Sequence, residues 1–411
     1  MAIRTPTPPR NLWRQRDFPL LLGGRLVSQL GDQLQFLALP LLVVALTGSP
    51  TQAGIVLGLQ TVVYLVFGLL AGALADRWDR KATMIWCEIG RGGLTATIPL
   101  AAWCGVLGMP QLFAVAVLNG VLTTLFSAAN SSALPNVVSR ADLPDALGAV
   151  GAASNTLRIV GASVAGVAYA AGRMVPFAVN AVSFLVSAAA LRGIRADFQR
   201  ERTSASVSPR ALLADIGHGL SWLWGRPVIR TLALLDAGDS LRFGAGYLLI
   251  IMLAQHLHAS PAQTGMVFTG AAVGALLGSL LAPALTRRYA LGKLSIAMLW
   301  VEALAFPGYA LAPTWWLLLV VAFAESVVSP TYNVALDAYR LSVTPDAFRG
   351  RVTGAIDTLT SGAAALGTMA SGVLITLLSA PTLTFLLAGW LALLALIATL
   401  SRTVRTATAP G

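Results

Sequence analysis

Apolar stretches of about 20 residues recur along the whole chain, separated by short polar or proline-containing segments. A stretch of that length is what an α-helix needs to cross the hydrocarbon core of a bilayer. The pattern therefore predicts an all-α membrane protein with twelve spanning helices. Their expected positions are residues 18–46, 51–75, 82–107, 110–133, 147–171, 175–192, 228–256, 261–286, 293–312, 314–337, 352–378 and 381–401.

Composition supports a membrane protein and excludes several other classes. Of the 411 residues, 56% are hydrophobic and only 11% are charged, whereas a soluble protein of this size would expose more charge. The net charge of +11 could indicate nucleic-acid binding, but the basic residues stand near predicted helix ends rather than on one face or tail. We therefore expect no nucleic-acid partner.

No cofactor is expected from the motifs of the chain. The two cysteines, Cys87 and Cys104, fall on one predicted helix about 25 Å apart, too far for a disulfide. Neither they nor the histidines have the spacing of a metal site, and no phosphate-binding loop for ATP is present. The first apolar run lacks a cleavage site and contains Arg25 and Asp32, so it is predicted to remain as a helix rather than to be removed as a signal.

The distribution of positive charge predicts the orientation in the membrane. If the amino terminus is cytoplasmic, nearly all Lys and Arg residues outside the spans fall in cytoplasmic segments, and Arg173 alone lies in an outer loop. Because positive charge accumulates on the cytoplasmic side, both termini are expected there. For a bacterial protein this places the chain in the inner membrane.

Two halves of the chain repeat one another. Ser49 to Gly54 matches Ser260 to Gly265, and Asp32 matches Asp239; Pro144 to Ala146 also matches Pro345 to Ala347. Such duplication predicts two pseudo-symmetric six-helix bundles around a central cavity. The expected division is a cytoplasmic tail at 1–17, a first bundle at 18–192, a cytoplasmic linker at 193–227, a second bundle at 228–401 and a tail at 402–411.

The linker contains a short amphipathic pattern. Leu212, Ile216, Leu220 and Leu223 recur at helical spacing, with Asp215 and other polar residues between them. This spacing predicts a helix lying at the inner membrane surface, and a soluble linker helix is the alternative.

The most polar short segment between two apolar runs is Gly72 to Thr83, which reads GALADRWDRKAT. It resembles the cytoplasmic signature of the major facilitator superfamily of secondary transporters, with matches at Gly72, Leu74, Ala75, Asp76, Arg77, Arg80 and Lys81. The resemblance implies a latch in which Asp76 faces the amino-terminal end of the eleventh helix while Arg80 joins a cytoplasmic charge network. It also implies the two-bundle fold. The plainer alternative is that these charges only set topology.

A second resemblance concerns the predicted fifth helix. Gly161 and Gly166 match glycines of the antiporter signature of the same superfamily, although Ala162 stands where that signature has proline. The match implies antiport, and ordinary packing of small residues is the alternative. Gly24 to Asp32 and Arg349 to Val352 are most similar to the macrolide and enterobactin exporters of the superfamily.

Ionisable residues inside predicted spans are candidates for proton coupling or for lining the cavity, because a charge in hydrocarbon is costly without a partner or water. They are Asp32, Arg158, Asp236, Asp239, Arg242, Glu302 and Glu325. Asp32 is the deepest acid of the first half and could bind a proton or pair with Arg158. A static ion pair, for example Asp239 with Arg242, is the alternative.

We therefore expect a secondary transporter, not an enzyme, that exports small amphiphilic molecules such as drugs, siderophores or secondary metabolites by proton antiport. Its expected partners are the small-molecule substrate, protons and the lipid bilayer, and it is expected to be a monomer. An importer or lipid flippase of the same fold is the alternative, as is a membrane sensor or assembly subunit without transport.

Overall fold

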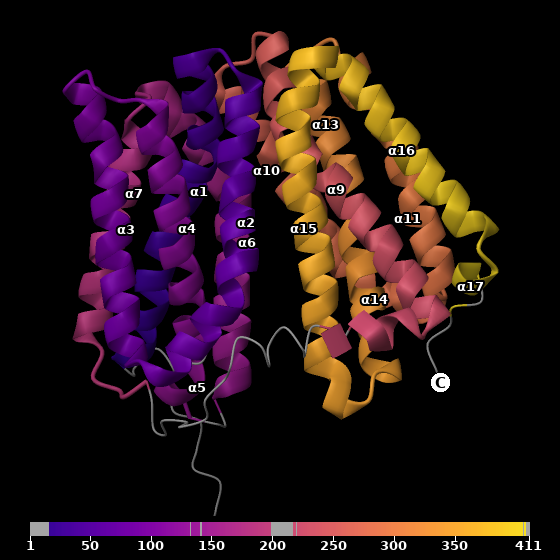
Figure 1. The fold of residues 1–411 in the computed structure, drawn as a ribbon, viewed down its shortest axis with the longest axis horizontal. Helices are drawn as coiled ribbons and strands as arrows, with labels where there is room; N and C mark the ends of the chain where they lie inside the picture. The colour runs from indigo at the N-terminus through magenta and orange to yellow at the C-terminus, as the bar shows by residue number, and fades with distance from the viewer. Residues whose placement is uncertain are drawn as a thin grey trace, which may run out of the picture. The chain divides into compact units, whose positions relative to one another are not determined.

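The computed structural model describes residues 16–131, 133–139, 142–198, 217–218, 220–405 and 407. Within these ranges the side chains of residues 69, 73, 75, 76, 131, 135, 341, 346 and 347 are not described. All regular elements of the described ranges are helices (Figure 1). In the first half of the chain they are α1 (Asp17–Thr47), α2 (Pro50–Arg77), α3 (Arg80–Trp103), α4 (Met109–Ser131), α5 (Leu134–Val137), α6 (Leu143–Ala171) and α7 (Val175–Gly193). In the second half they are α9 (Pro227–His256), α10 (Pro261–Arg288), α11 (Leu291–Ala305), α12 (Pro307–Leu311), α13 (Trp315–Ser326), α14 (Ser329–Val343), α15 (Asp346–Leu378), α16 (Ala380–Leu400) and α17 (Arg402–Arg405).

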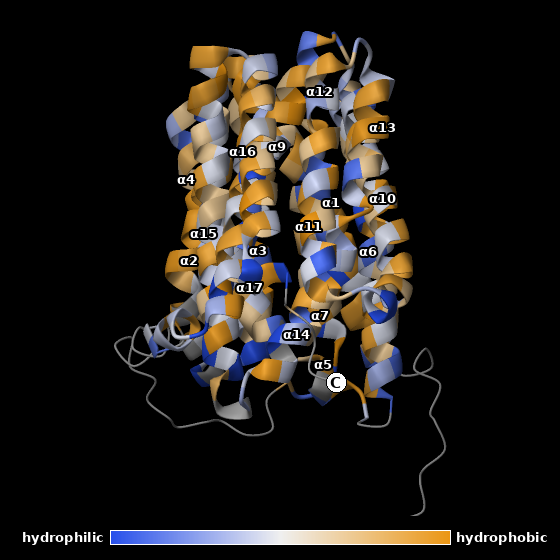
Figure 2. Ribbon diagram, turned by 90° about the vertical axis from the view of Figure 1, so that its right-hand side faces the viewer, coloured by the Kyte–Doolittle hydropathy of each residue, from blue (hydrophilic) through white to orange (hydrophobic). Residues whose placement is uncertain are grey.

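Within the described residues, ten helical stretches are long and apolar enough to cross a membrane. The helices α3 and α6 are of similar length but fall outside this group. Their predicted spans contain polar and charged residues, among them Glu88, Arg91 and Arg158. Figure 2 shows apolar residues along the helices and hydrophilic ones mainly near helix ends. The all-α membrane fold is thus confirmed, while the number of twelve spans stays a prediction.

Two of the predicted spans are interrupted. The span expected at 293–312 divides into α11 and α12, because Pro307 has no backbone N–H to continue the ladder of α11. The span expected at 314–337 divides into α13 and α14, with Pro330 in the first turn of the second piece. Both interruptions lie within a turn or so of a buried acid, Glu302 and Glu325 respectively.

The backbone contacts divide the chain into two compact units, and each has its own core. The first unit comprises residues 1–35, 66–157 and 174–206. In it α3 packs mainly against α7 and α4. At Gly31 a Cβ would overlap side-chain atoms of Asn180 and Ser183, so this position requires glycine for α1 to approach α7.

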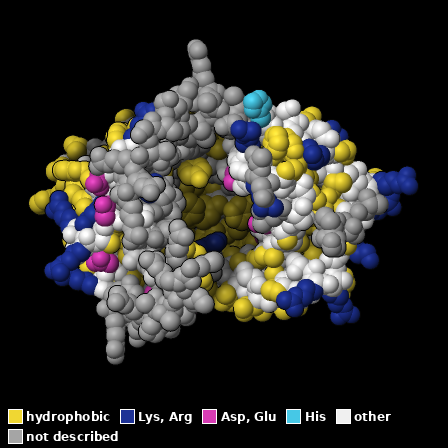
Figure 3. All heavy atoms as spheres, turned by 90° about the horizontal axis from the view of Figure 1, so that it is seen from below, with side chains coloured by type: hydrophobic (Ala, Val, Ile, Leu, Met, Phe, Trp, Pro, Cys, Tyr) yellow, Lys and Arg dark blue, Asp and Glu magenta, His cyan; other side chains and the backbone are white. Residues whose placement is uncertain are grey.

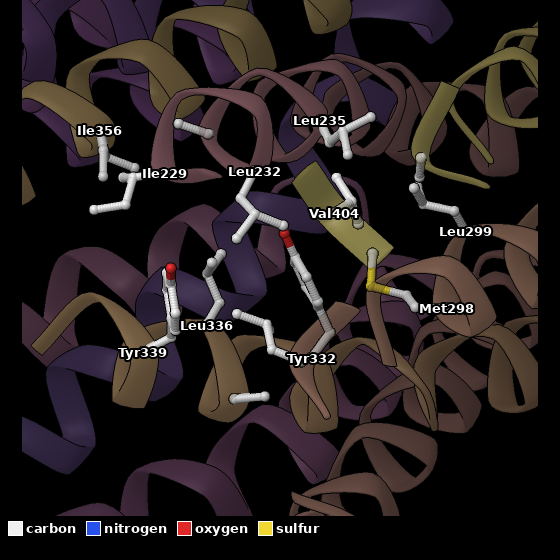
Figure 4. Close-up of a cluster of buried hydrophobic side chains, with 14 of the residues drawn as sticks. Ile229, Leu232, Leu235, Met298, Leu299, Tyr332, Leu336, Tyr339, Ile356 and Val404 are labelled. Carbon is white, nitrogen blue, oxygen red and sulfur yellow. The ribbon is translucent and has the colours of Figure 1, made fainter. Parts of the chain in front are cut away.

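The second unit comprises residues 36–65, 158–173 and 207–411. Its most extensive helix pair is α9 with α15, where a Cβ on Gly244 or Gly367 would overlap a carbonyl oxygen of the facing helix. Figure 4 shows one of its apolar clusters, in which Leu232 and Leu336 lie near Tyr332. The division of the chain at residues 192 and 227 stays a prediction.

The linker helix is described only in part. Residues 217–218 and 220–224 are helical, while Leu212 and Ile216 lie outside the described residues. Leu223 is fully buried in the apolar cluster of Figure 4, and Trp222 packs against that cluster and stacks on Phe348. This end of the linker therefore packs on the second unit, and its predicted position at the membrane surface stays a prediction.

Candidate functional site

Three acidic side chains surround one buried arginine in the second unit. Arg242 of α9 is 4% exposed. Its Nη2 lies 2.7 Å from Oδ1 of Asp239 and 3.3 Å from Oε2 of Glu302, and its Nη1 donates to Oε1 of Glu325. The carboxylates come from α9, α11 and α13, so the arginine links three helices.

A tyrosine completes this group, which we call the Arg242 cluster (Asp239, Arg242, Glu302, Tyr309 and Glu325). The hydroxyl of Tyr309 on α12 donates to Oε2 of Glu325 at 2.7 Å. Oε1 of Glu302 has no hydrogen-bond partner among the described residues. Because α11 ends just after Glu302 and α13 just after Glu325, the broken helices bring both acids and Tyr309 to one point.

The Arg242 cluster has more acids than bases. With all three carboxylates ionised, one guanidinium would leave an excess negative charge in a buried site at membrane depth. Such a charge is costly where water and counter-ions are excluded. The charges of the cluster therefore do not balance when all three carboxylates are ionised.

A second charged group, the Arg91 cluster (Asp32, Glu88 and Arg91), lies in the first unit. Nη2 of Arg91 on α3 lies 2.7 and 2.8 Å from the two carboxylate oxygens of Asp32 on α1. Nη1 of Arg91 is 4.0 Å from Glu88, one turn earlier on α3. Glu88 is fully buried and accepts hydrogen bonds at 3.1 Å from Ser28 and Ser187. Here, too, acids outnumber bases.

The two clusters occupy related positions in the repeat, but the arginine is on the third helix of the first half and on the first helix of the second half. Asp32 on α1 corresponds to Asp239 on α9, as the sequence indicates. By the same comparison Arg91 on α3 corresponds to Glu302 on α11. In the first unit the acid Asp32 on α1 thus pairs with Arg91 on α3. In the second unit the arginine is on the first helix of the pair, α9, and the acid Glu302 is on α11.

The structure places the remaining intramembrane candidates separately. Asp236 on α9 pairs with Arg340 on α14, with 2.7 Å between Oδ2 and Nη2. Arg158 is exposed on α6 and forms no ion pair with a described residue. Since Asp32 and Arg158 belong to different units, the expected contact between them stays a prediction.

In the hairpin between α2 and α3, the described groups have mainly local contacts. Asp79 is the N-cap of α3 and accepts from the backbone nitrogen of Ala82 at 2.8 Å. Lys81 donates to the carbonyl oxygen of Ile194 after α7. A Cβ at Gly72 would meet no atom within 4 Å, and the role of this glycine in the signature stays a prediction. Arg77 is exposed, whereas Arg80 is half-buried and takes part in a polar or ring contact. The side chain of Asp76 lies outside the described residues.

Gly166 of the antiporter-like segment lies at a close helix contact within the second unit. A Cβ on Gly166 of α6 would overlap the carbonyl oxygen of Pro261 on α10, and one on Gly265 would overlap that of Ala162. One turn away, Ser163 and Thr269 share a hydrogen bond of 2.7 Å. Gly161 is buried on the same helix. The role of this contact in antiport stays a prediction.

Comparison with known proteins identifies the family. The model of the family described as "Transmembrane secretion effector", of the major facilitator superfamily, matches residues 9–410. The chain belongs to this family. It is therefore a transporter of the major facilitator type and not an enzyme, and it is a multi-pass membrane protein whose family binds small-molecule substrates.

Individual relatives of this transporter are similar over most of their length. The multidrug efflux pump Tap of Mycobacterium tuberculosis is 27% identical over 370 residues, covering 86% of each chain. The Tap pump of Mycolicibacterium fortuitum is 28% identical over 366 residues, covering 86% of this chain and 88% of its own. An MFS-type transporter of Bacillus subtilis, YfiS, is 27% identical over 384 residues, covering 88% of this chain and 87% of its own.

Solved structures show the same fold. The nucleoside transporter NupG superposes with a TM-score of 0.73 at 16% identity, covering 92% of this transporter and 98% of that chain. A bacterial homologue of the iron transporter ferroportin, in an inward-facing state, gives a TM-score of 0.74 at 17% identity, covering 95% of this transporter and 99% of that chain.

Sequence reasoning missed three members of the transporter's charge clusters. Glu88 and Arg91 stand three residues apart within a predicted span, so the cost argument that singled out Asp32 applies to them as well. Tyr309 gave no comparable signal, because a tyrosine in an apolar helix is common. Its role depends on the break at Pro307, which the apolar pattern did not predict.

Proposed function

We propose that this transporter exports small amphiphilic molecules, such as drugs, siderophores or secondary metabolites, in exchange for protons by alternating access. The observation that supports it is the excess of carboxylates over guanidinium groups in both charge clusters. An acid-rich cluster at membrane depth gains stability when it binds a proton and loses stability when a cation or ion-pair partner leaves. That is the property a proton-coupling site needs.

In this mechanism the two clusters have different roles. The side chain of Asp32 is 43% exposed, whereas its partner Arg91 is 4% exposed. Asp32 can therefore exchange a proton with water while Arg91 stays fixed, and we assign it the coupling step. The Arg242 cluster is enclosed, with Glu302 only 1% and Glu325 7% exposed, so its protons exchange only when the surrounding helices move.

The relatives support the substrate class. Two of the similar proteins are named multidrug efflux pumps, and they align over more than four-fifths of each chain. Export, rather than import or lipid flipping, is proposed on this likeness.

The orientation completes the proposal. We place both termini and the linker in the cytoplasm of a bacterial inner membrane, because basic residues gather at the ends of helices on that side. Lys and Arg side chains are exposed in the end-on view of Figure 3. Basic residues at helix ends include Arg192 in α7 and Arg287 and Arg288 in α10. A monomer suffices for this mechanism.

Flux in liposomes tests the proposal. The purified transporter would be reconstituted, a pH gradient imposed, and a panel of amphiphilic fluorescent compounds offered in turn. We expect accumulation of at least one compound against its concentration gradient, and collapse of that accumulation when a protonophore is added. Accumulation that follows a membrane potential but ignores the pH gradient contradicts proton antiport. Lack of flux for every compound, with a folded protein, favours the sensor or assembly alternative.

A further inference from the structure

A pocket of about 530 Å³ lies in the second unit, where the ends of α1, α6 and α9 meet the start of α10. This volume falls within the range of small-molecule binding sites, about 300–1,000 Å³. In the proposed orientation these helix ends are on the outer side of the membrane. The pocket is distinct from both charge clusters and from the hairpin motif.

The pocket contains an arginine without a partner. Arg173, in the turn between α6 and α7, is exposed and is the only charged residue among the described ones that line the pocket. Neither an ion pair nor a hydrogen bond joins its guanidinium to a described residue. It is also the one basic residue of the predicted outer loops. A lone cation where positive charge is otherwise excluded indicates a function other than setting topology.

A buried donor lies beside that arginine. Tyr169, one turn earlier at the end of α6, lines the same pocket and is 7% exposed. Its hydroxyl has no hydrogen-bond partner among the described residues. Buried hydroxyl groups are rarely left without a partner, because the loss of hydration is not compensated. An acceptor oxygen entering the pocket would supply the missing partner.

The rest of the wall is mostly apolar. Leu41, Val44 and Ala45 of α1 form one side, and Gln255 and Thr264 contribute polar groups on the other. Thr264 is already engaged, since its hydroxyl donates to the carbonyl oxygen of Ser260. No described lining residue is acidic. A ligand that suits this pocket has one anionic group and a short apolar tail.

We propose that the pocket formed by Tyr169, Arg173 and the apolar end of α1 binds an amphiphilic anion, with the carboxylate or phosphate on Arg173 and Tyr169 and the tail against Leu41 and Val44. The guanidinium gives a charge-assisted hydrogen bond and the tyrosine a neutral one. The placement on the outer face rests on the proposed orientation. Binding itself does not depend on it.

Occupancy of the pocket would also stabilise the helix contact beside it. The ligand touches α1, α6, α9 and the start of α10, which includes Pro261, the residue that packs on Gly166. A ligand that binds only while these four helix ends are together stabilises that arrangement by mass action. We therefore expect bound anion to raise the thermal stability of the protein.

Binding would be measured on the detergent-solubilised protein, by calorimetry and by thermal unfolding, with octanoate and short-chain phosphatidylglycerol as anionic probes and octanol and octylammonium as references. We expect at least one anion to bind and to raise the melting temperature. Arg173→Gln should weaken binding roughly tenfold or more, and Tyr169→Phe roughly threefold to tenfold. Arg192→Gln is the matched control, since Arg192 is an exposed arginine at the opposite end of α7.

The possible results identify the source of the ligand and decide whether the site exists. Binding of octanoate identifies a soluble amphiphile as the ligand class, and binding of phosphatidylglycerol alone identifies a lipid headgroup. Either supports the site if Arg173→Gln removes it and Arg192→Gln does not. Equal binding by wild type and Arg173→Gln, equal binding of octanol, or binding of neither anion overturns it. Because no flux is measured, failure of the site is distinguishable from failure of the proposed transport.

Discussion

Arg91 holds Asp32 through a single nitrogen, with Nη2 at 2.7 and 2.8 Å from the two carboxylate oxygens. The arginine comes from α3 and the acid from α1, so the contact joins two helices of the first unit. Glu88, at 4.0 Å from Nη1, is the alternative partner of the same guanidinium. Protonation of Asp32 therefore leaves Arg91 with a second acid nearby rather than unpaired, which lowers the cost of the neutral state.

This arrangement predicts the effect of Asp32→Asn. The amide keeps the shape of the side chain but cannot ionise, so coupling to protons should be lost while Arg91 keeps Glu88. In proteoliposomes with an imposed pH gradient, accumulation of substrate should be abolished and downhill exchange should persist. Asp337→Asn is the control, because Asp337 is 68% exposed and lies 3.5 Å from Arg340. If the Asp32→Asn protein still concentrates substrate, the coupling residue is elsewhere, and Asp239 becomes the first candidate.

Much of the fold follows from the sequence, because span length and hydrophobicity are local properties. The repeat identified Asp239 as the counterpart of Asp32 in the sequence. The cost of burying charge singled out Arg242, Glu302 and Glu325. What could not be predicted is which charges meet, since this depends on helix facing and on the breaks after α11 and α13. Thus the sequence did not single out Arg91, the ion-pair partner of Asp32 within the first unit.

The Arg242 cluster predicts a strong asymmetry between removing the base and removing an acid. Arg242→Leu leaves three carboxylates without their shared partner, and loss of one side of a buried ion pair costs about 3–5 kcal/mol. Glu325→Gln keeps a partner for Tyr309 and reduces the excess of acid, so the stability of the protein should change little. Thermal unfolding in detergent would compare the two.

A double variant gives the control for the cluster. Adding Asp239→Asn to Arg242→Leu removes one of the stranded charges, so part of the lost stability should return. Equal melting temperatures for Arg242→Leu and Glu325→Gln would contradict the idea that the arginine compensates buried negative charge. Recovery that is absent in the double variant would show that packing, not charge, sets the cost.

The contact between α6 and α10 predicts that Gly166 cannot accept a larger residue. In Gly166→Val the branched side chain would overlap the backbone at Pro261, and overpacking of this kind costs roughly 1–3 kcal/mol. We expect a lower melting temperature and reduced flux. Gly148→Val on the same helix is the control, because a Cβ there meets no atom within 4 Å. Matching losses in both variants would indicate a general effect of valine in α6 instead of a contact at Gly166.

Orientation can be tested at the two ends of one helix. Arg173 precedes α7 and Arg192 lies in its last turn, and both are exposed. In a protein with Cys104 replaced by serine, Arg173→Cys should react with an impermeant thiol reagent added to intact cells, and Arg192→Cys should react only after the membrane is opened. The buried Cys87 can stay. Labelling in the reverse order would overturn the proposed cytoplasmic location of the termini.

The last prediction concerns Asp76, for which the resemblance to the family signature implies a position against the amino-terminal end of the eleventh span. That span is α15, which begins at Asp346, a few residues earlier than the sequence indicated. A carboxylate at a helix amino terminus contributes about 0.3–1 kcal/mol, or about 2 kcal/mol when partly buried. This is enough to shift two conformations of similar free energy but too little to unfold the protein. Asp76→Asn should therefore lower transport while expression and melting temperature stay unchanged.

The same hairpin offers a matched control for that variant. Asp79 caps α3 by accepting from the backbone nitrogen of Ala82, and asparagine caps a helix about as well as aspartate. Asp79→Asn thus removes one negative charge three residues away without removing a helix cap. Spin labels on the cytoplasmic ends of α2 and α15 would report the populations of the two conformations. A shift in Asp76→Asn that Asp79→Asn lacks supports the latch. Full turnover in Asp76→Asn with unchanged label distances means that the carboxylate only sets topology.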